Sequence, residues 1–322
     1  DMAEFKNPLE MRDAPDPFMT YDPETGYYYA LFTCGNRLEL YRSRHAASIL
    51  TDKDTLVVFR VNEKDGIYGC VWAPEMHKAP NGKWYIYTSG SITPGDGQKR
   101  LFVMESLTAD PFDGFIFKGK LDDDLFTIDP TIYTDENGKQ YICYSHSSAE
   151  DNQRLEIREM ANPYTFGEKS AVVAVAEYPW ELVPPYVGKS KINEGAFFVK
   201  RGERLFIIYS GNGCWSNDYC LGVVEYKGGD MCSSDSWVKH PEPIFVHGED
   251  TYGPGHASFF KSPDGKELWC AYHVMLSFNE KAVAAPRYFC IQKVNFDETG
   301  YPVMGKVPPL DTLHKAPSGE IE

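Results

Sequence analysis

The chain has 322 residues, a formal net charge of −15 at pH 7 and an apolar fraction of 42%. This composition is that of a globular protein and excludes a disordered chain, and the length suffices for one large all-β domain or two ordinary domains. The negative charge argues against nucleic acid or an anionic membrane as a partner, because no stripe of Lys and Arg offsets it, and no apolar run reaches the roughly eighteen residues of a membrane span.

One segment recurs five times along the chain. Each copy reads as a short strand, a turn that contains glycine, and an aromatic-rich strand that ends in small polar residues. The copies cover residues 16–33, 73–90, 129–146, 194–211 and 256–273. Their turn glycines are Gly26, Gly82, Gly138, Gly202 and Gly265, at intervals of 56, 56, 64 and 63 residues. Such glycines between two strand-like runs are typical of β-hairpins.

Further strands are expected after each hairpin. Third strands are predicted over 38–43, 101–106, 155–160, 220–226 and 288–294, and weaker fourth strands over 56–61 and 171–176. There is almost no helical periodicity. Five consecutive units of three or four antiparallel strands predict a five-bladed β-propeller, an all-β fold, because a β-sandwich would not repeat the same turn five times. No linker divides the chain, so we expect one catalytic propeller domain over residues 1–322.

The first strand of each propeller blade lines the central channel. Counting back from each turn glycine, the positions that begin these strands are Asp16, Ala73, Asp129, Glu194 and His256. Two residues further on, facing the same way, are Phe18, Glu75, Thr131, Ala196 and Ser258. Three carboxylates and a histidine would therefore meet at one end of the channel. Facing acids repel one another and push their pKa values apart, which favours catalysis over a structural role.

The eight cysteines do not suggest a metal site, since no Cys-x-x-Cys pair occurs. Cys143, Cys270 and Cys290 lie inside apolar strands and are expected to be free buried thiols. Cys214 and Cys220 flank a predicted loop and are candidates for a disulfide bond.

At the residues that face the channel, the sequence resembles glycoside hydrolase family 43, five-bladed propeller enzymes that cleave arabinose- and xylose-containing polysaccharides. The resemblance extends from Asp13 to about Pro302. It rests on motifs in order and at blade spacing: "DAPDPF" (13–18), "VWAPEM" (71–76), "IDPTIY" (128–133), "INEGAFF" (192–198) and "GPGHASFF" (253–260).

The resemblance implies inverting hydrolysis by single displacement. Asp16 would be the general base that activates water, and Glu194 the general acid that protonates the leaving oxygen. Asp129 would orient Glu194 and keep its pKa high. Asp16 and Asp129 each precede a proline, so both also fit a turn-forming aspartate, whereas Glu194 has no such alternative.

The resemblance also implies a sugar-binding set of Phe32, Trp72, His256 and Arg287. His256 would lie near a central metal ion, commonly calcium bound largely through water, and a direct metal–His256 bond is the weaker alternative. The chemistry itself would need no cofactor. Arg287 has a second interpretation as part of blade construction, because other arginines also precede third strands. Trp215 reads equally well as a wall of an outer subsite or as a cover for a blade.

The expected activity is an inverting exo-glycosidase that removes terminal α-L-arabinofuranosyl residues from plant cell-wall polysaccharides or oligosaccharides. β-Xylosidase and endo-arabinanase activities are the alternatives within the family. A phosphorylase would need a phosphate-binding cationic cluster in place of Asp16. A non-catalytic carbohydrate-binding propeller would keep the aromatic residues and lose the acids.

We expect a secreted or periplasmic protein whose signal peptide has been removed, with the cytoplasm as the alternative. The sequence does not indicate the oligomeric state.

Overall fold

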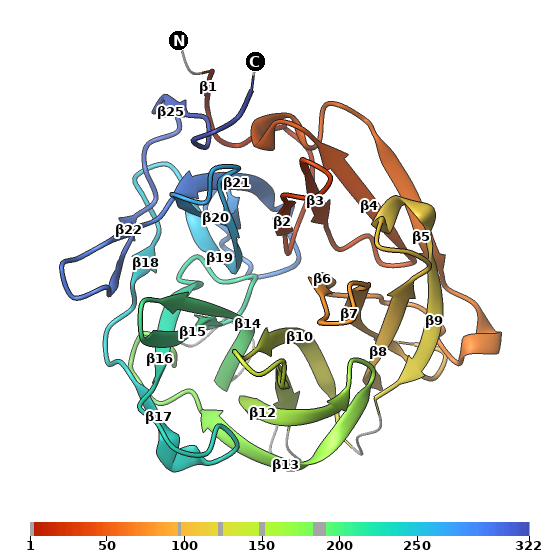
Figure 1. The fold of residues 1–322 in the computed structure, drawn as a ribbon. Coiled ribbons are helices and arrows are strands. Elements are labelled where there is room, and N and C mark those ends of the chain that lie inside the picture. The colour runs from red at the N-terminus through yellow and green to blue at the C-terminus, as the bar shows by residue number, and fades with distance from the viewer. Residues whose placement is uncertain (1–2, 96–97, 122–124, 148–151, 183–190, 322) are drawn as a thin grey trace.

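The computed structural model describes residues 3–95, 98–121, 125–147, 152–182 and 191–321. Its strands form antiparallel blades arranged in a ring around a central axis (Figure 1). The predicted five-bladed β-propeller is therefore confirmed, as are the predicted hairpins and third strands.

Each blade is built from strands that are consecutive in the chain. Blade 1 consists of β2 (Phe18–Asp22), β3 (Tyr27–Leu31), β4 (Arg37–Ser43) and β5 (Thr55–Arg60). Blade 2 consists of β6 (Glu75–Lys78), β7 (Trp84–Ser91), β8 (Lys99–Ser106) and β9 (Phe115–Lys120). Blade 3 consists of β10 (Thr127–Thr134), β11 (Gln140–Ser147), β12 (Asn152–Asn162) and β13 (Thr165–Ala174). Blade 4 consists of β14 (Lys191–Arg201), β15 (Arg204–Gly211), β16 (Cys220–Tyr226) and β17 (Trp237–Lys239). Blade 5 consists of β19 (Tyr252–Lys261), β20 (Leu268–Met275) and β21 (Tyr288–Lys293).

The remaining elements are short and lie outside this pattern. β18 (Phe245–Val246) pairs with β16 and with β24 (Gly305–Lys306), and β22 (Asn295–Phe296) pairs with β23 (Pro302–Val303). The 3-10 helices are η1 (Ala46–Ser48), η2 (Glu63–Asp65), η3 (Pro111–Asp113) and η4 (Ser234–Ser236). Within the described ranges, no helix has the length and apolar character that crossing a membrane requires.

The N-terminal segment closes the ring by running along the outer side of β21. The Leu9 amide donates to the Phe289 carbonyl, and the Ala14 amide donates to the Arg287 carbonyl. Beyond this segment, β1 (Glu4–Phe5) pairs with β25 (His314–Lys315), so the two ends of the chain lie together (Figure 1). Blade 5 therefore gains its outermost strand-like segment from the N-terminus, which continues directly into blade 1.

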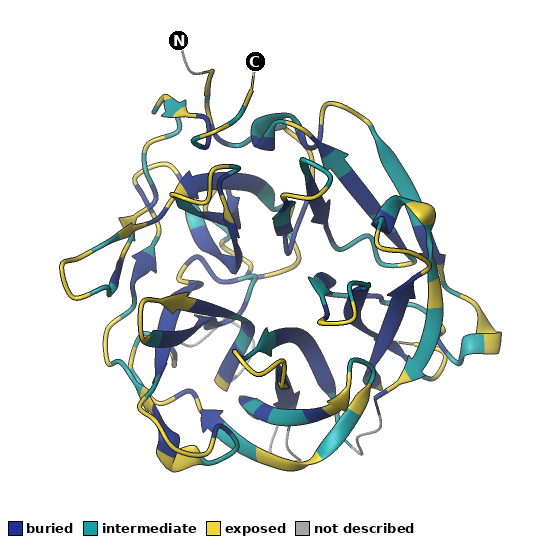
Figure 2. Cartoon of the chain, in the orientation of Figure 1, coloured by how far each residue is buried: buried dark blue, intermediate teal, exposed yellow. Residues whose placement is uncertain are grey.

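The core consists of apolar clusters that lie between neighbouring blades. Phe206 of blade 4 and Phe245 of β18 pack with Tyr272 of blade 5, and Tyr28 of blade 1 packs against Phe260 on the other side of blade 5. Corresponding clusters join blades 1 and 2, 2 and 3, and 3 and 4. Figure 2 shows that the inner strands of the blades are mostly buried, with exposed residues mainly at the rim and in loops. Each blade thus depends on both neighbours for its burial, which holds the inner strands rigidly.

Ring closure should depend strongly on Asn7. Its Nδ2 donates to the Ile291 carbonyl at 2.8 Å, and its Oδ1 accepts from the Ile291 amide at 3.0 Å. We expect Asn7→Ala to lower the free energy of unfolding by about 1–3 kcal/mol, because it leaves two buried backbone groups unpaired. Denaturant unfolding measures this, with Asn36→Ala at an exposed site as the control. An equal effect of the two substitutions would contradict this account of closure.

Candidate active site

The inner strand of each of three blades contains an irregularity in its first half. The pairing register shifts between Ile128 and Thr131, between Glu194 and Phe197, and between Gly255 and Ser258. The residue that follows the first position of each shift has a left-handed backbone: φ is 56° at Asp129, 59° at Gly195 and 50° at His256. Asp16 has φ 56° ahead of β2. An extra residue of this kind bends a strand and redirects its side chains.

This register corrects the alignment expected from the sequence. The residue equivalent to Asp16, Asp129 and His256 is Gly195, and Glu194 lies one position earlier. Likewise Phe197, rather than Ala196, is the fourth-blade equivalent of Thr131. Counting back from the turn glycine gave the wrong residue because the hairpin turn of blade 4 is shorter than the others. The sequence spacing cannot distinguish a shorter turn from a shift at the start of the strand.

The predicted acids nevertheless converge on one pocket with a volume of about 300 Å³. Of the predicted residues, its lining contains Asp16, Trp72, Asp129, Glu194, His256 and Arg287. Trp215, which the sequence left undecided, lines the pocket too. Residues that sequence reasoning did not assign to the site are Thr33, Phe126, Ile128, Gln153 and Cys214.

Asp16 lies among groups that stabilise its ionised form. Arg287 Nη1 donates to Asp16 Oδ1 at 3.1 Å, and Thr33 Oγ1 donates to Oδ2 at 2.7 Å. His256 Nδ1 lies 3.3 Å from Oδ1. Burial alone would raise the pKa of Asp16, but the positive charge of Arg287, with smaller contributions from His256 and Thr33, lowers it well below the usual range. Asp16 is therefore a carboxylate that can accept a proton.

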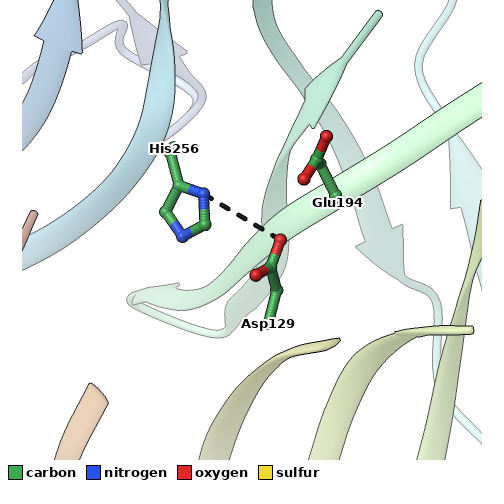
Figure 3. Close-up of side chains that lie close together, drawn as sticks. All are labelled: Asp129, Glu194 and His256. Carbon is green, nitrogen blue, oxygen red and sulfur yellow. Dashed lines mark ion pairs between the residues drawn. The ribbon is translucent and has the colours of Figure 1, made fainter. Parts of the chain in front are cut away.

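Glu194 has the opposite surroundings. Burial raises its pKa well above the usual range, and the neighbouring charge of Asp129 raises it further. Burial also raises the pKa of Asp129, but the hydrogen bond between the two carboxyl groups opposes that rise, whereas it adds to the rise in the pKa of Glu194. The shared proton is therefore assigned to Glu194. Figure 3 shows these side chains beside His256, whose Nδ1 is 3.9 Å from Asp129 Oδ2. Glu194 is therefore a carboxylic acid that can donate a proton.

The backbone around Glu194 is held in place from two sides. The Gly195 amide donates to Asp129 Oδ2 at 3.0 Å, which fixes the acid relative to its neighbour. A Cβ at position 195 would lie 3.2 Å from both His256 Nδ1 and Ser210 Oγ. Gly195 is thus required twice, by its left-handed backbone and by the close approach of the histidine ring.

The polar residues that end the second strands connect one blade to the next. Ser145 Oγ donates to the Asn193 carbonyl at 2.8 Å, and the His256 amide donates to Ser210 Oγ at 2.8 Å. The Asp16 amide donates to His273 Nδ1 at 3.0 Å, and burial lowers the pKa of His273 well below its usual value. The repeated small polar endings of the second strands were visible in the sequence, and they were the signal that could have identified these residues.

Phe32 is not among the residues that line the described pocket, so the pocket does not support its predicted role in sugar binding. It is buried in the cluster between blades 5 and 1, where its ring packs edge-on against Tyr41 and Phe289. Its position at the end of β3 is near the site along the chain, but the side chain faces the neighbouring blade.

Three further residues complete the comparison with the sequence. Glu75 is buried, and His77 Nε2 lies 2.7 Å from its Oε1, which agrees with a structural acid rather than a catalyst. The expected disulfide between Cys214 and Cys220 is wrong, since both thiols are free. Cys214 lines the pocket, whereas Cys220 is buried at the start of β16.

The donor atoms of Asp129, Glu194 and His256 lie within 4.8 Å of one another, so a direct metal site has to be considered. Calcium takes about six to eight oxygen ligands. Asp129 Oδ2 already accepts a hydrogen bond from Gly195, and the Glu194 carboxyl shares its proton with Asp129. These three side chains therefore do not fit a calcium ion that they would ligate directly. A calcium ion held through water stays a prediction.

Comparison with known proteins identifies the family. Residues 5–302 match the family model described as Glycosyl hydrolases family 43. An extracellular exo-alpha-(1->5)-L-arabinofuranosidase of Streptomyces chartreusis is 32% identical over 280 residues, which cover 84% of this chain and 82% of that protein. The protein of the same name from Streptomyces avermitilis is 32% identical over 325 residues, or 95% of this chain and 64% of that one.

Solved structures agree with the sequence comparison. An alpha-L-arabinofuranosidase from Lactobacillus brevis superposes with a TM-score of 0.84 at 25% identity, covering 96% of this chain and 98% of that chain. A thermostable family-43 glycoside hydrolase gives a TM-score of 0.79 at 23% identity, covering 98% of this chain and 99% of that one, which supports the fold. The chain belongs to glycosyl hydrolase family 43 and is a glycoside hydrolase.

Proposed function

We propose that the chain hydrolyses terminal α-L-arabinofuranosyl residues with inversion of configuration. Asp16 acts as the general base, Glu194 as the general acid, and Asp129 orients Glu194. The observation that carries this assignment is the contrast between the two carboxyl groups: Asp16 is held ionised by Arg287, and Glu194 is held protonated by burial beside Asp129. An inverting glycosidase requires one carboxyl group in each state.

In this mechanism Asp16 takes a proton from a water molecule that attacks the anomeric carbon. Glu194 gives its proton to the glycosidic oxygen, so that the leaving group departs as a neutral alcohol. Bond formation and bond breaking occur on opposite faces of the sugar, and the configuration inverts. Thr33 and Arg287 each donate to one oxygen of Asp16, which orients the base toward the pocket.

The choice of sugar is supported by the relatives named as exo-acting arabinofuranosidases at 32% identity. A pocket of about 300 Å³ is at the small end of the range for ligand sites, which favours a terminal sugar over a long bound chain. Trp72 supplies an aromatic face to the pocket, and Lys99 Nζ packs 3.8 Å from the centroid of that ring. Arabinose-containing oligosaccharides and polysaccharides are thus the proposed substrates.

β-Xylosidase and endo-arabinanase remain alternatives of the same chemistry, and a carbohydrate-binding propeller without activity is the alternative of a different class. A lectin would have no use for a carboxylic acid that burial keeps protonated.

We also propose secretion, because the two Streptomyces relatives are named extracellular. Finding the protein only inside fractionated cells of the producing organism would contradict secretion.

A substrate panel tests the activity. We expect turnover of 4-nitrophenyl α-L-arabinofuranoside to exceed that of the β-D-xyloside and of linear arabinan, with the inverted anomer appearing first by NMR.

Glu194→Gln should lower kcat on arabino-oligosaccharides by about 10²–10⁴-fold, because the leaving oxygen is no longer protonated. Faster turnover of the xyloside would replace the proposed sugar, and a first product of retained configuration would overturn the mechanism.

The pH profile tests the assignment of the base. The ionised form of Asp16 and the protonated form of Glu194 are both required, so activity falls below the lowered pKa of Asp16 and above the raised pKa of Glu194. Arg287→Met should raise the pKa of Asp16 and move the acidic limb of kcat/KM upward by about 1–2 pH units.

The alkaline limb should move upward by less, because Arg287 binds Asp16 directly, whereas it is the last of the causes that act on the pKa of Glu194. Arg204→Met is the control, since Arg204 pairs with Glu225 and does not line the pocket. An acidic limb that stays in place in Arg287→Met would refute Asp16 as the base.

We propose that hydrolysis needs no metal, since the carboxyl groups of the site act through one another and through protein donors. Exhaustive treatment with EDTA should leave kcat within about twofold of the untreated enzyme, even where a water-held calcium ion contributes to stability. A loss of activity that calcium restores, at unchanged secondary structure by circular dichroism, would contradict this proposal.

A further inference from the structure

A buried ion pair outside the pocket joins Glu181, in the segment that precedes β14, to Lys239 of β17 in blade 4. Lys239 Nζ lies 2.8 Å from Glu181 Oε1 and 2.6 Å from Oε2, and the exposed fractions of the two side chains are 6% and 0%. Glu181 Oε1 also accepts from the amides of Glu177 and Tyr178, and Oε2 accepts from Tyr209 at 3.1 Å. Removing two charges from water is costly, and the cost is offset only when the pair is as fully hydrogen-bonded as this one.

The pair is connected to the strand that carries the acid. Asn193 Nδ2 donates to Glu181 Oε2 at 2.6 Å, and Asn193 Oδ1 accepts from Lys239 Nζ at 2.8 Å. The Asn193 side chain is fully buried, so both ends of its amide are held by the two charges. Its own carbonyl accepts from Ser145 of blade 3.

Asn193 immediately precedes Glu194, and the Gly195 amide that follows is bound to Asp129. The backbone of Glu194 is therefore held on its N-terminal side by Asn193 and on its C-terminal side by Asp129. A shift of about 1 Å in a catalytic group lowers rates strongly. We propose that the Glu181–Lys239 pair acts through Asn193 to position the general acid, an inference that rests on the proposed role of Glu194.

The dependence of the rate on the leaving group distinguishes a positioning role from a purely structural one. A misplaced acid slows the departure of a poor leaving group, which needs a proton, far more than that of a good leaving group, which does not. The substrates are therefore phenyl and 2,4-dinitrophenyl glycosides of whichever sugar the wild-type enzyme hydrolyses fastest. This choice keeps the test valid when arabinose proves to be the wrong sugar, and a wild-type enzyme inactive on all sugars would instead refute the proposed function.

Two variants break the connection in different ways. Asn193→Ala removes the link and leaves the ion pair intact, which protects folding, and Lys239→Met removes the charge that holds both partners. We expect each to lower kcat on the phenyl glycoside by about 10- to 100-fold and on the dinitrophenyl glycoside by less than about threefold. Glu194→Gln serves as the reference for complete loss of the acid.

Glu225→Gln is the matched control. Glu225 is 3% exposed and pairs with Arg204 of the same blade, whose side chain is 28% exposed, and neither residue lines the pocket. Its loss should lower thermal stability and change kcat on the two glycosides equally. The proposal is overturned when folded Asn193→Ala enzyme loses activity equally on both glycosides, or loses none; Lys239→Met is interpreted only where circular dichroism matches the wild type.

Discussion

The site depends on one backbone constraint, a left-handed residue where the inner strand begins. In Asp16, Asp129 and His256 a side chain occupies this conformation, which costs about 1–2 kcal/mol for a residue other than glycine. Packing against both neighbouring blades holds the strands that carry these residues, so the conformation persists. The repeated bend directs different side chains toward the same pocket, and a pseudo-symmetric fold thereby acquires an asymmetric site.

Blade 4 uses the same bend in another way. Gly195 occupies the left-handed position, and its missing side chain leaves room for the His256 ring. Its amide binds Asp129, so the strand contributes a backbone donor where other blades contribute a side chain. Glu194 is displaced by one residue and meets Asp129 from a different direction, which places two carboxyl groups side by side and keeps one proton between them.

Arg287 contributes both to the closure of the ring and to the charge state of Asp16. The Arg287 amide binds Asp13, its carbonyl accepts from Ala14, and its guanidinium binds Asp16. The junction of the first and last blades therefore also supplies the cation that keeps the proposed base ionised. Its second interpretation, as part of blade construction, is thus compatible with its place in the pocket.

The repeats of glycine turns and aromatic strands were sufficient to predict the blades, and blade spacing brought Asp16, Asp129, Glu194 and His256 to one place. Periodic patterns of this kind are local, so a single sequence records them directly. The sequence could not separate Glu194 from Gly195 as the equivalent position, because a one-residue bulge and a one-residue change in turn length give the same spacing.

Contacts between blades were decided by the tertiary structure alone. Phe32 faces a neighbouring blade rather than the sugar pocket, and His273 of blade 5 accepts a hydrogen bond from the amide of Asp16 at the start of blade 1. The sequence by itself determined the propeller, the acids and the family resemblance, through repetition along the chain. Only the closed ring decided which acid is ionised and which is protonated, because charge, burial and hydrogen bonds from residues far apart in sequence set a pKa.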